Sequence, residues 1–141
     1  MYYLKTEQSF DSAHFLYGYH GKCANIHGHR WRVIATIKSN KLLDDKQHQG
    51  MIVDFSDLKN DLKTIADYFD HALIIEKNSL SEKLYQALID EDFRIIKLPF
   101  RPTAENLAKY IYDKLAQSYN IDNVEVYETP NNCASYRGEH E

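Results

Sequence analysis

An alternating pattern between residues 27 and 37 is the feature that most restricts how this chain can fold. Every second position carries a ring or an aliphatic side chain, and most positions between them are polar. The alternating members are His27, His29, Trp31, Val33, Ala35 and Ile37. A period of two predicts a β-strand, over about 28–39, with one face buried. His27 and His29 lie on that apolar side, where an imidazole needs a partner.

A third histidine is expected to meet these two. Residues 2–13 are rich in Tyr, Thr, Phe and Ser, which predicts a first strand with His14 at or just past its end. Glycines at 18 and 21 open a loop that returns the chain to the second strand, so the two strands are expected to pair antiparallel. A single strand histidine is usually an ordinary core or surface residue. Three at one end of a strand pair predict a metal site, since catalytic zinc takes three protein ligands and leaves a fourth position open.

The middle of the chain predicts two strong helices. Apolar residues recur at helical spacing over about 55–68, with Asp54 or Ser56 available as the N-cap. A second helix is expected after Pro102, with Thr103 as its N-cap and its end near residue 119. Between them, 79–91 suggests a short helix.

Short strands complete the predicted order. Residues 93–100 suggest a short strand closed by Pro99, and the C-terminal stretch alternates at Val124, Val126 and Glu128. The chain then turns at 130–132 and resumes in a last strand through Tyr136. The whole order is that of an α+β fold.

Length and charge limit the classes of function. A chain of 141 residues with 43% hydrophobic content can bury one ordinary core, so one domain over 1–141 is expected. A net charge of −4 argues against a general binder of nucleic acid or of membrane surfaces. The local cluster of Lys22, Arg30 and Arg32 could still hold a phosphorylated small molecule.

The expected compartment is the cytoplasm. No apolar run approaches the length of a bilayer span, and the N-terminus has no secretory pattern. Cys23 and Cys133 could form a disulfide, but free thiols are expected in a reducing compartment, where one of them would stand beside a metal site.

Two acidic features have both a functional and an ordinary interpretation. Asp70 and His71 stand side by side where the first helix runs out, as in sites that handle protons, although an Asp just past a helix is usually a turn residue. Glu128 shares parity with two valines. If that face is buried, the carboxylate needs N–H donors from the protein or a ligand; if it is exposed, Glu128 is a charge at a strand end.

These elements carry five short motifs in a characteristic order. They are SAHFL, CANIHGH, FDHALI, PTAEN and VYET, spread over nearly the whole chain. In this combination the chain resembles the superfamily of 6-pyruvoyltetrahydropterin synthase and 6-carboxytetrahydropterin synthase. The resemblance implies a tunnelling fold (T-fold): a four-stranded antiparallel sheet with two helices packed on one face, here with a short insertion at about 72–98. It also implies a homo-oligomeric ring, a hexamer, with active sites at subunit contacts.

The resemblance further implies a role for nine residues. The zinc ligands would be His14, His27 and His29, the catalytic residues Cys23, Asp70 and His71, and the substrate-binding residues Glu128, Thr103 and Lys22. Glu128 would accept the paired N–H donors of a pterin ring, and Thr103 would add a hydrogen bond to the same ring.

Two products are possible within this superfamily. The implied substrate is 7,8-dihydroneopterin triphosphate, which the pyruvoyl branch converts by triphosphate elimination alone. The carboxy branch, which serves queuosine biosynthesis, also cleaves a carbon–carbon bond and releases acetaldehyde. The spacing of three residues between Cys23 and His27 resembles the carboxy branch, as does the ending ETPNNCASYRG. We therefore expect 6-carboxytetrahydropterin synthase activity; the alternatives are the pyruvoyl reaction and a zinc- and pterin-binding protein without catalysis.

Overall fold

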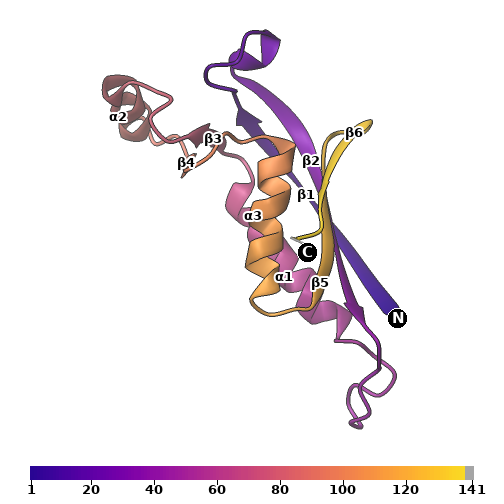
Figure 1. Cartoon of the computed structure of the whole chain (residues 1–141). Helices are drawn as coiled ribbons and strands as arrows, with labels where there is room; N and C mark the ends of the chain where they lie inside the picture. The colour runs from indigo at the N-terminus through magenta and orange to yellow at the C-terminus, as the bar shows by residue number, and fades with distance from the viewer. Residues whose placement is uncertain (139–141) are drawn as a thin grey trace.

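A computed structural model describes residues 1–138, so the last three residues of the domain expected over 1–141 lie outside the described part. Six strands and three α-helices follow one another along the chain (Figure 1). In order they are β1 (Tyr2–His14), the short 3-10 helix η1 (Lys22–Ala24), β2 (His27–Ser39), α1 (Phe55–Phe69), β3 (Leu73–Glu76), α2 (Glu82–Asp90), β4 (Ile95–Leu98), α3 (Ala104–Ala116), β5 (Ile121–Thr129) and β6 (Asn132–Tyr136).

The sheet is larger than the four antiparallel strands that were expected. Its strand order is β4-β3-β1-β2-β5-β6. The expected four-stranded antiparallel unit is present as β1, β2, β5 and β6. The strand number was wrong because the 72–98 insertion contributes two strands, of which only the second was expected. β3 pairs parallel with the last two residues of β1, and β4 pairs parallel with β3.

Two helices cover one face of the sheet, as expected (Figure 1). Asp54 caps α1, its Oδ1 accepting from the Ser56 N–H at 2.8 Å, and Thr103 caps α3. Both helices bury the apolar stripe that their spacing predicted. The third helix, α2, begins at Glu82 after the N-cap Ser81 and has no buried residue. It projects from the body of the molecule in Figure 1.

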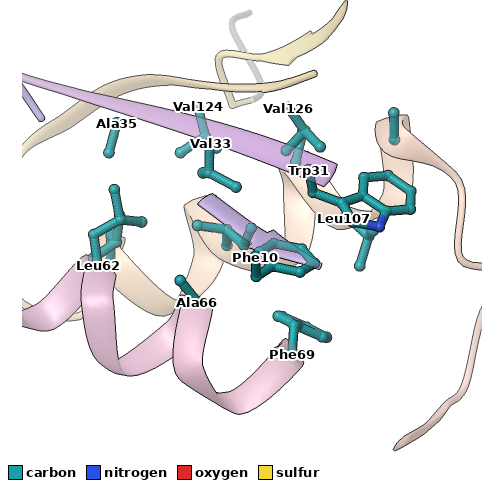
Figure 2. Close-up of a cluster of buried hydrophobic side chains, with 14 of the residues drawn as sticks. Phe10, Trp31, Val33, Ala35, Leu62, Ala66, Phe69, Leu107, Val124 and Val126 are labelled. Atoms are coloured by element: carbon teal, nitrogen blue, oxygen red, sulfur yellow. The ribbon is translucent and has the colours of Figure 1, made fainter. Parts of the chain in front are cut away.

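The core lies between the sheet and α1 and α3 (Figure 2). The alternating positions of β2 from Trp31 to Ile37 are all at most 1% exposed, which confirms the predicted parity. Phe10 of β1 stacks between two aromatic rings, with centroid distances of 5.9 Å to Trp31 and 5.5 Å to Phe69. Because a slip of one residue would turn all of these side chains to the other face, the core fixes the register of β1 against β2. That register sets His14 opposite His27.

Two further expectations concern the chain as a whole. Cys23 and Cys133 are both free thiols, so the disulfide alternative is wrong. Within residues 1–138, no helix combines the length and the apolar character needed to cross a membrane.

Candidate metal centre and active site

Three histidines and one glutamate converge at the end of the β1–β2 pair. His14 Nε2 lies 3.0 Å from His27 Nε2 and 3.3 Å from Glu128 Oε1, and His29 Nε2 lies 3.4 Å from the same oxygen. One donor atom from each of the four residues falls within 4.8 Å of all the others. Four donors at tetrahedral zinc bond lengths are roughly 3.3 Å apart. The structure therefore brings the predicted trio together and adds Glu128 to it.

The outer ring nitrogens of two histidines are already occupied. His14 Nδ1 lies 2.8 Å from the Pro102 carbonyl oxygen, and His27 Nδ1 lies 2.7 Å from the Asn25 carbonyl oxygen. A carbonyl can only accept, so each Nδ1 donates its hydrogen and each Nε2 keeps a free lone pair for a metal. His29 Nε2 is buried without a hydrogen-bond partner. These donors fit a small divalent cation.

Burial keeps two of these imidazoles neutral. Desolvation lowers the pKa of His14 to about 4, and it also lowers the pKa of His29, against an opposing effect of the Glu128 carboxylate. A metal binds only the neutral imidazole. Both side chains are therefore in their metal-binding form at neutral pH.

Cys23 lies in the loop that joins β1 to β2. Its carbonyl oxygen accepts from the Leu16 N–H at 2.8 Å, which closes the loop on itself. Gly18 has a φ of 81°, which L side chains rarely adopt, and a Cβ on Gly21 would stand 2.7 Å from the Tyr19 ring. Arg101 donates to the Tyr17 carbonyl oxygen at 2.8 Å. The loop thus has a defined shape, with Cys23 half-buried in it.

The backbone of β1 holds Asp70 and His71 in place. Asp70 Oδ1 accepts from the Asp11 N–H at 2.9 Å, and the His71 N–H donates to the Asp11 carbonyl oxygen at 2.7 Å. The Asp11 hydrogen bond is the main cause of a lowered pKa at Asp70. The charged Asp70 Oδ2 lies 2.7 Å from His71 Nδ1. This contact orients the imidazole and leaves its Nε2 available to a substrate.

Several predicted site residues do not touch one another within the chain. Among residues 1–138, no hydrogen bond or ion pair joins Cys23 to Asp70, to His71 or to the histidine trio. One cavity of about 740 Å³, however, is lined by both His29 and His71. His71 therefore faces a cavity that β2 also borders, while the imidazole of His29 turns to the other face of the sheet, toward His14 and Glu128.

The three basic residues that were expected to form a cluster, Lys22, Arg30 and Arg32, have separate interaction partners. Arg30 pairs with Asp11 at 3.2 Å and Arg32 with Glu7 at 3.3 Å. Lys22 lies in η1, where its carbonyl oxygen accepts from Asn25. No contact among residues 1–138 joins it to either arginine.

One cation at the site had no signal in the sequence. Arg94 follows α2, and its Nη1 donates to the Asp70 carbonyl oxygen at 2.8 Å, while its Nη2 donates to the Tyr68 carbonyl oxygen. These contacts span 24 and 26 residues. Only the return of the chain through β4 brings them about.

Comparison with known proteins places this arrangement in a family. The family model described as 6-pyruvoyl tetrahydropterin synthase matches residues 3–139. A protein of Haemophilus influenzae named 6-carboxy-5,6,7,8-tetrahydropterin synthase is 35% identical over 141 residues, covering 97% of this chain and 99% of its own length. A protein of Rickettsia felis with the same name is 36% identical, covering 86% and 90%.

Solved structures share the fold at lower identity. An uncharacterized protein from Wolinella succinogenes matches with a TM-score of 0.81 and 22% identity, covering 98% of both chains. The 6-pyruvoyl tetrahydropterin synthase of Caenorhabditis elegans matches with a TM-score of 0.69 and 23% identity, covering 98% of this chain and 96% of its own. The three-dimensional fold is therefore shared with both.

Proposed function

Since the chain belongs to the 6-pyruvoyl tetrahydropterin synthase family, we propose that it is a carbon–carbon lyase acting on 7,8-dihydroneopterin triphosphate. The products would be 6-carboxy-5,6,7,8-tetrahydropterin, acetaldehyde and triphosphate. The cellular role would be a step of queuosine biosynthesis in the cytoplasm. The observation that carries the proposal is the convergence of three imidazole nitrogens and the Glu128 carboxylate in one donor group.

Zinc is the metal that we propose for the histidine group. Three imidazoles with a carboxylate nearby form a donor set that zinc accepts. Bound there, zinc would polarise a side-chain oxygen of the substrate and so make the neighbouring C–H bond more acidic. His14, His27 and His29 would hold the ion.

Proton transfer is assigned to two groups of this chain. Cys23 Sγ, as the thiolate, would take a proton from the substrate side chain and return it. His71 Nε2 would transfer a proton at a second carbon or oxygen of the substrate, because the Nδ1 of the same ring is held by the Asp70 carboxylate. Lys22 is the neighbour of Cys23 in the chain, and its ammonium group would bind the phosphorylated end of the substrate.

Substrate recognition is assigned to Glu128 and Thr103. The Glu128 side chain is 30% exposed and lines two cavities, one of them shared with His29. Its two oxygens could accept the amino and ring N–H donors of the pterin. Thr103 Oγ1 accepts from the Asn106 N–H at 3.2 Å as a helix cap, and its hydroxyl hydrogen stays available for the ring.

Changing Glu128 to Gln is expected to weaken pterin binding by roughly 2 kcal/mol or more, because one acceptor becomes a donor that opposes the donors of the ring. Isothermal titration calorimetry with a pterin ligand measures the change, with metal content determined on the same sample. Glu125→Gln is the matched control, since Glu125 lies on the same strand and points to the other face of the sheet. Unchanged pterin affinity in Glu128→Gln would place this carboxylate outside the pterin site.

A homo-oligomeric ring is part of the proposal. Among the described residues, β1 pairs with β3 only at Ala13 and His14, and the backbone of Asp11 bonds to Asp70 and His71. The edge of β1 from Tyr2 to Phe10 is therefore open, and β6 ends the sheet on the other side. Open strand edges accept strands from another chain. Asp70 and His71 lie where this open edge ends, which supports active sites at the contacts between subunits, with six copies as the expected number.

The product decides between the two branches of the family. We expect purified protein with 7,8-dihydroneopterin triphosphate to yield 6-carboxytetrahydropterin and acetaldehyde, a reaction that consumes one water. Elimination of triphosphate to the pyruvoyl compound consumes none. The two reactions are distinguished by trapping the aldehyde with a hydrazine and by measuring the mass of the pterin product by mass spectrometry. Pyruvoyl-tetrahydropterin without aldehyde would make the pyruvoyl reaction the function, and retention of pterin without triphosphate release would mean a binding protein.

A further inference from the structure

The cavity of about 740 Å³ that His71 lines has one wall made by the inserted segment between residues 72 and 98. That wall includes apolar side chains of α2 and of the turn after it, Leu88 and Phe93, followed by Arg94. Across the cavity lie residues of β1 and β2, among them Arg30. The insertion therefore forms part of the wall of this cavity.

The two arginines of this cavity differ in their partners. Arg30 is paired with the Asp11 carboxylate, so much of its charge is compensated. Arg94 contacts two backbone carbonyl oxygens and lies 5.8 Å from the centroid of the Tyr68 ring. Among residues 1–138, no carboxylate forms an ion pair with Arg94. Its positive charge is therefore available to an anion in the cavity.

The contacts of Arg94 also fix its guanidinium. A guanidinium has five N–H donors in one plane, and the carbonyl oxygens of Tyr68 and Asp70 take two of them. About three donors remain on a group whose position is already set, which lowers the entropy lost on binding an anion. Planar donors of this kind suit phosphate oxygens.

We propose that Arg94, assisted by Arg30, binds the triphosphate of the substrate in this cavity. The proposal rests on the function proposed above and assigns the phosphate end of that substrate. The phosphates leave from the substrate side chain, so their subsite must border the groups that act on that chain, and this cavity is lined by His71, to which proton transfer on that chain is assigned. The inserted segment then has a specific use: it delivers a cation to the leaving group.

Inorganic tripolyphosphate, the leaving group itself, tests the proposal by calorimetry on the metal-loaded protein. Arg94→Gln removes the charge but keeps an N–H₂ that can donate to a carbonyl. We expect it to weaken tripolyphosphate binding about tenfold or more, since a hydrogen bond to a charged group is commonly worth that much. Affinity for uncharged 7,8-dihydroneopterin should stay within about twofold, because that ligand has no phosphate. Lys97→Gln is the control: Lys97 lies on β4 over the Tyr85 ring and should leave both affinities unchanged.

Two outcomes would overturn the assignment. If Arg94→Gln binds tripolyphosphate as wild type does, the phosphates lie elsewhere. If it loses affinity for both ligands equally, Arg94 only supports the turn at Asp70. Arg94→Lys, which keeps the charge, should retain more tripolyphosphate affinity than Arg94→Gln. Turnover by the wild-type protein is measured separately, so failure of the lyase activity is distinguishable from failure of this subsite.

Discussion

Replacing His14 with alanine is expected to leave the purified protein with little bound metal. His14 is fully buried, and its Nδ1 contact with the Pro102 carbonyl oxygen aims Nε2 at the other donors. Losing a group that merely supports a metal ligand costs roughly 10- to 100-fold in affinity, so losing the ligand itself should cost at least about 100-fold. Competition with a chromophoric chelator and elemental analysis measure the loss. The same result is expected for His29→Ala.

A matched histidine serves as the control for this experiment. His48 lies in the 40–50 loop and contacts Asp45 at 2.8 Å, and it is not part of the metal group. His48→Ala should keep the full metal content of wild type. Circular dichroism on all three variants separates loss of metal from loss of the fold. Full zinc in both His14→Ala and His29→Ala would show that the ion binds somewhere else.

Cys23→Ala is expected to lose turnover while keeping its metal and its pterin affinity. The side chain is half-buried in a loop held by backbone contacts, so its removal should disturb the fold little. A positioned acid or base contributes roughly 10²- to 10⁴-fold to a rate, and a drop of that size in kcat is expected with a nearly unchanged KM. Steady-state assay of triphosphate release measures both constants.

The second cysteine offers a control of the same chemistry. Cys133 lies on β6, with its Sγ 4.0 Å from the Glu125 carboxylate, and burial raises the pKa of this thiol. Cys133→Ala should therefore turn over at the rate of wild type. A Cys23→Ala protein with a near wild-type rate would remove the thiolate from the mechanism and leave His71 as the sole proton carrier.

The local sequence pattern was sufficient to predict a helix or strand wherever one face of that element is buried. The parity of β2 put His27 and His29 on one side of a strand, and the helical spacing with its caps located α1 and α3 within a few residues. Because side chains alternate along any strand, the shared face of the two histidines follows from the chain alone. The gathering of His14 beside them needed only one antiparallel pair with a long connection, which the sequence also predicts.

The sequence could not predict which strands the short apolar runs pair with. Residues 72–75 form too short a run to show a period, and β3 exists because the end of β1 offers an edge to it. The position of α2 was likewise not predictable, because none of its residues is buried in the core. Propensity suggested a helix there, but only the fold could make it the wall of a cavity.

The contacts that complete the site are long-range, and only the tertiary structure decided them. The sequence by itself determined which side chains share a face, the approximate ends of the long helices, and a family resemblance that named the candidate metal ligands. It could not bring the Glu128 oxygen to the histidine nitrogens or Arg94 to the Asp70 carbonyl oxygen. The physical reason is that parity and periodicity describe neighbours along one element. Contacts between elements depend on the order of strands in the sheet, which is fixed by the burial of the whole core at once.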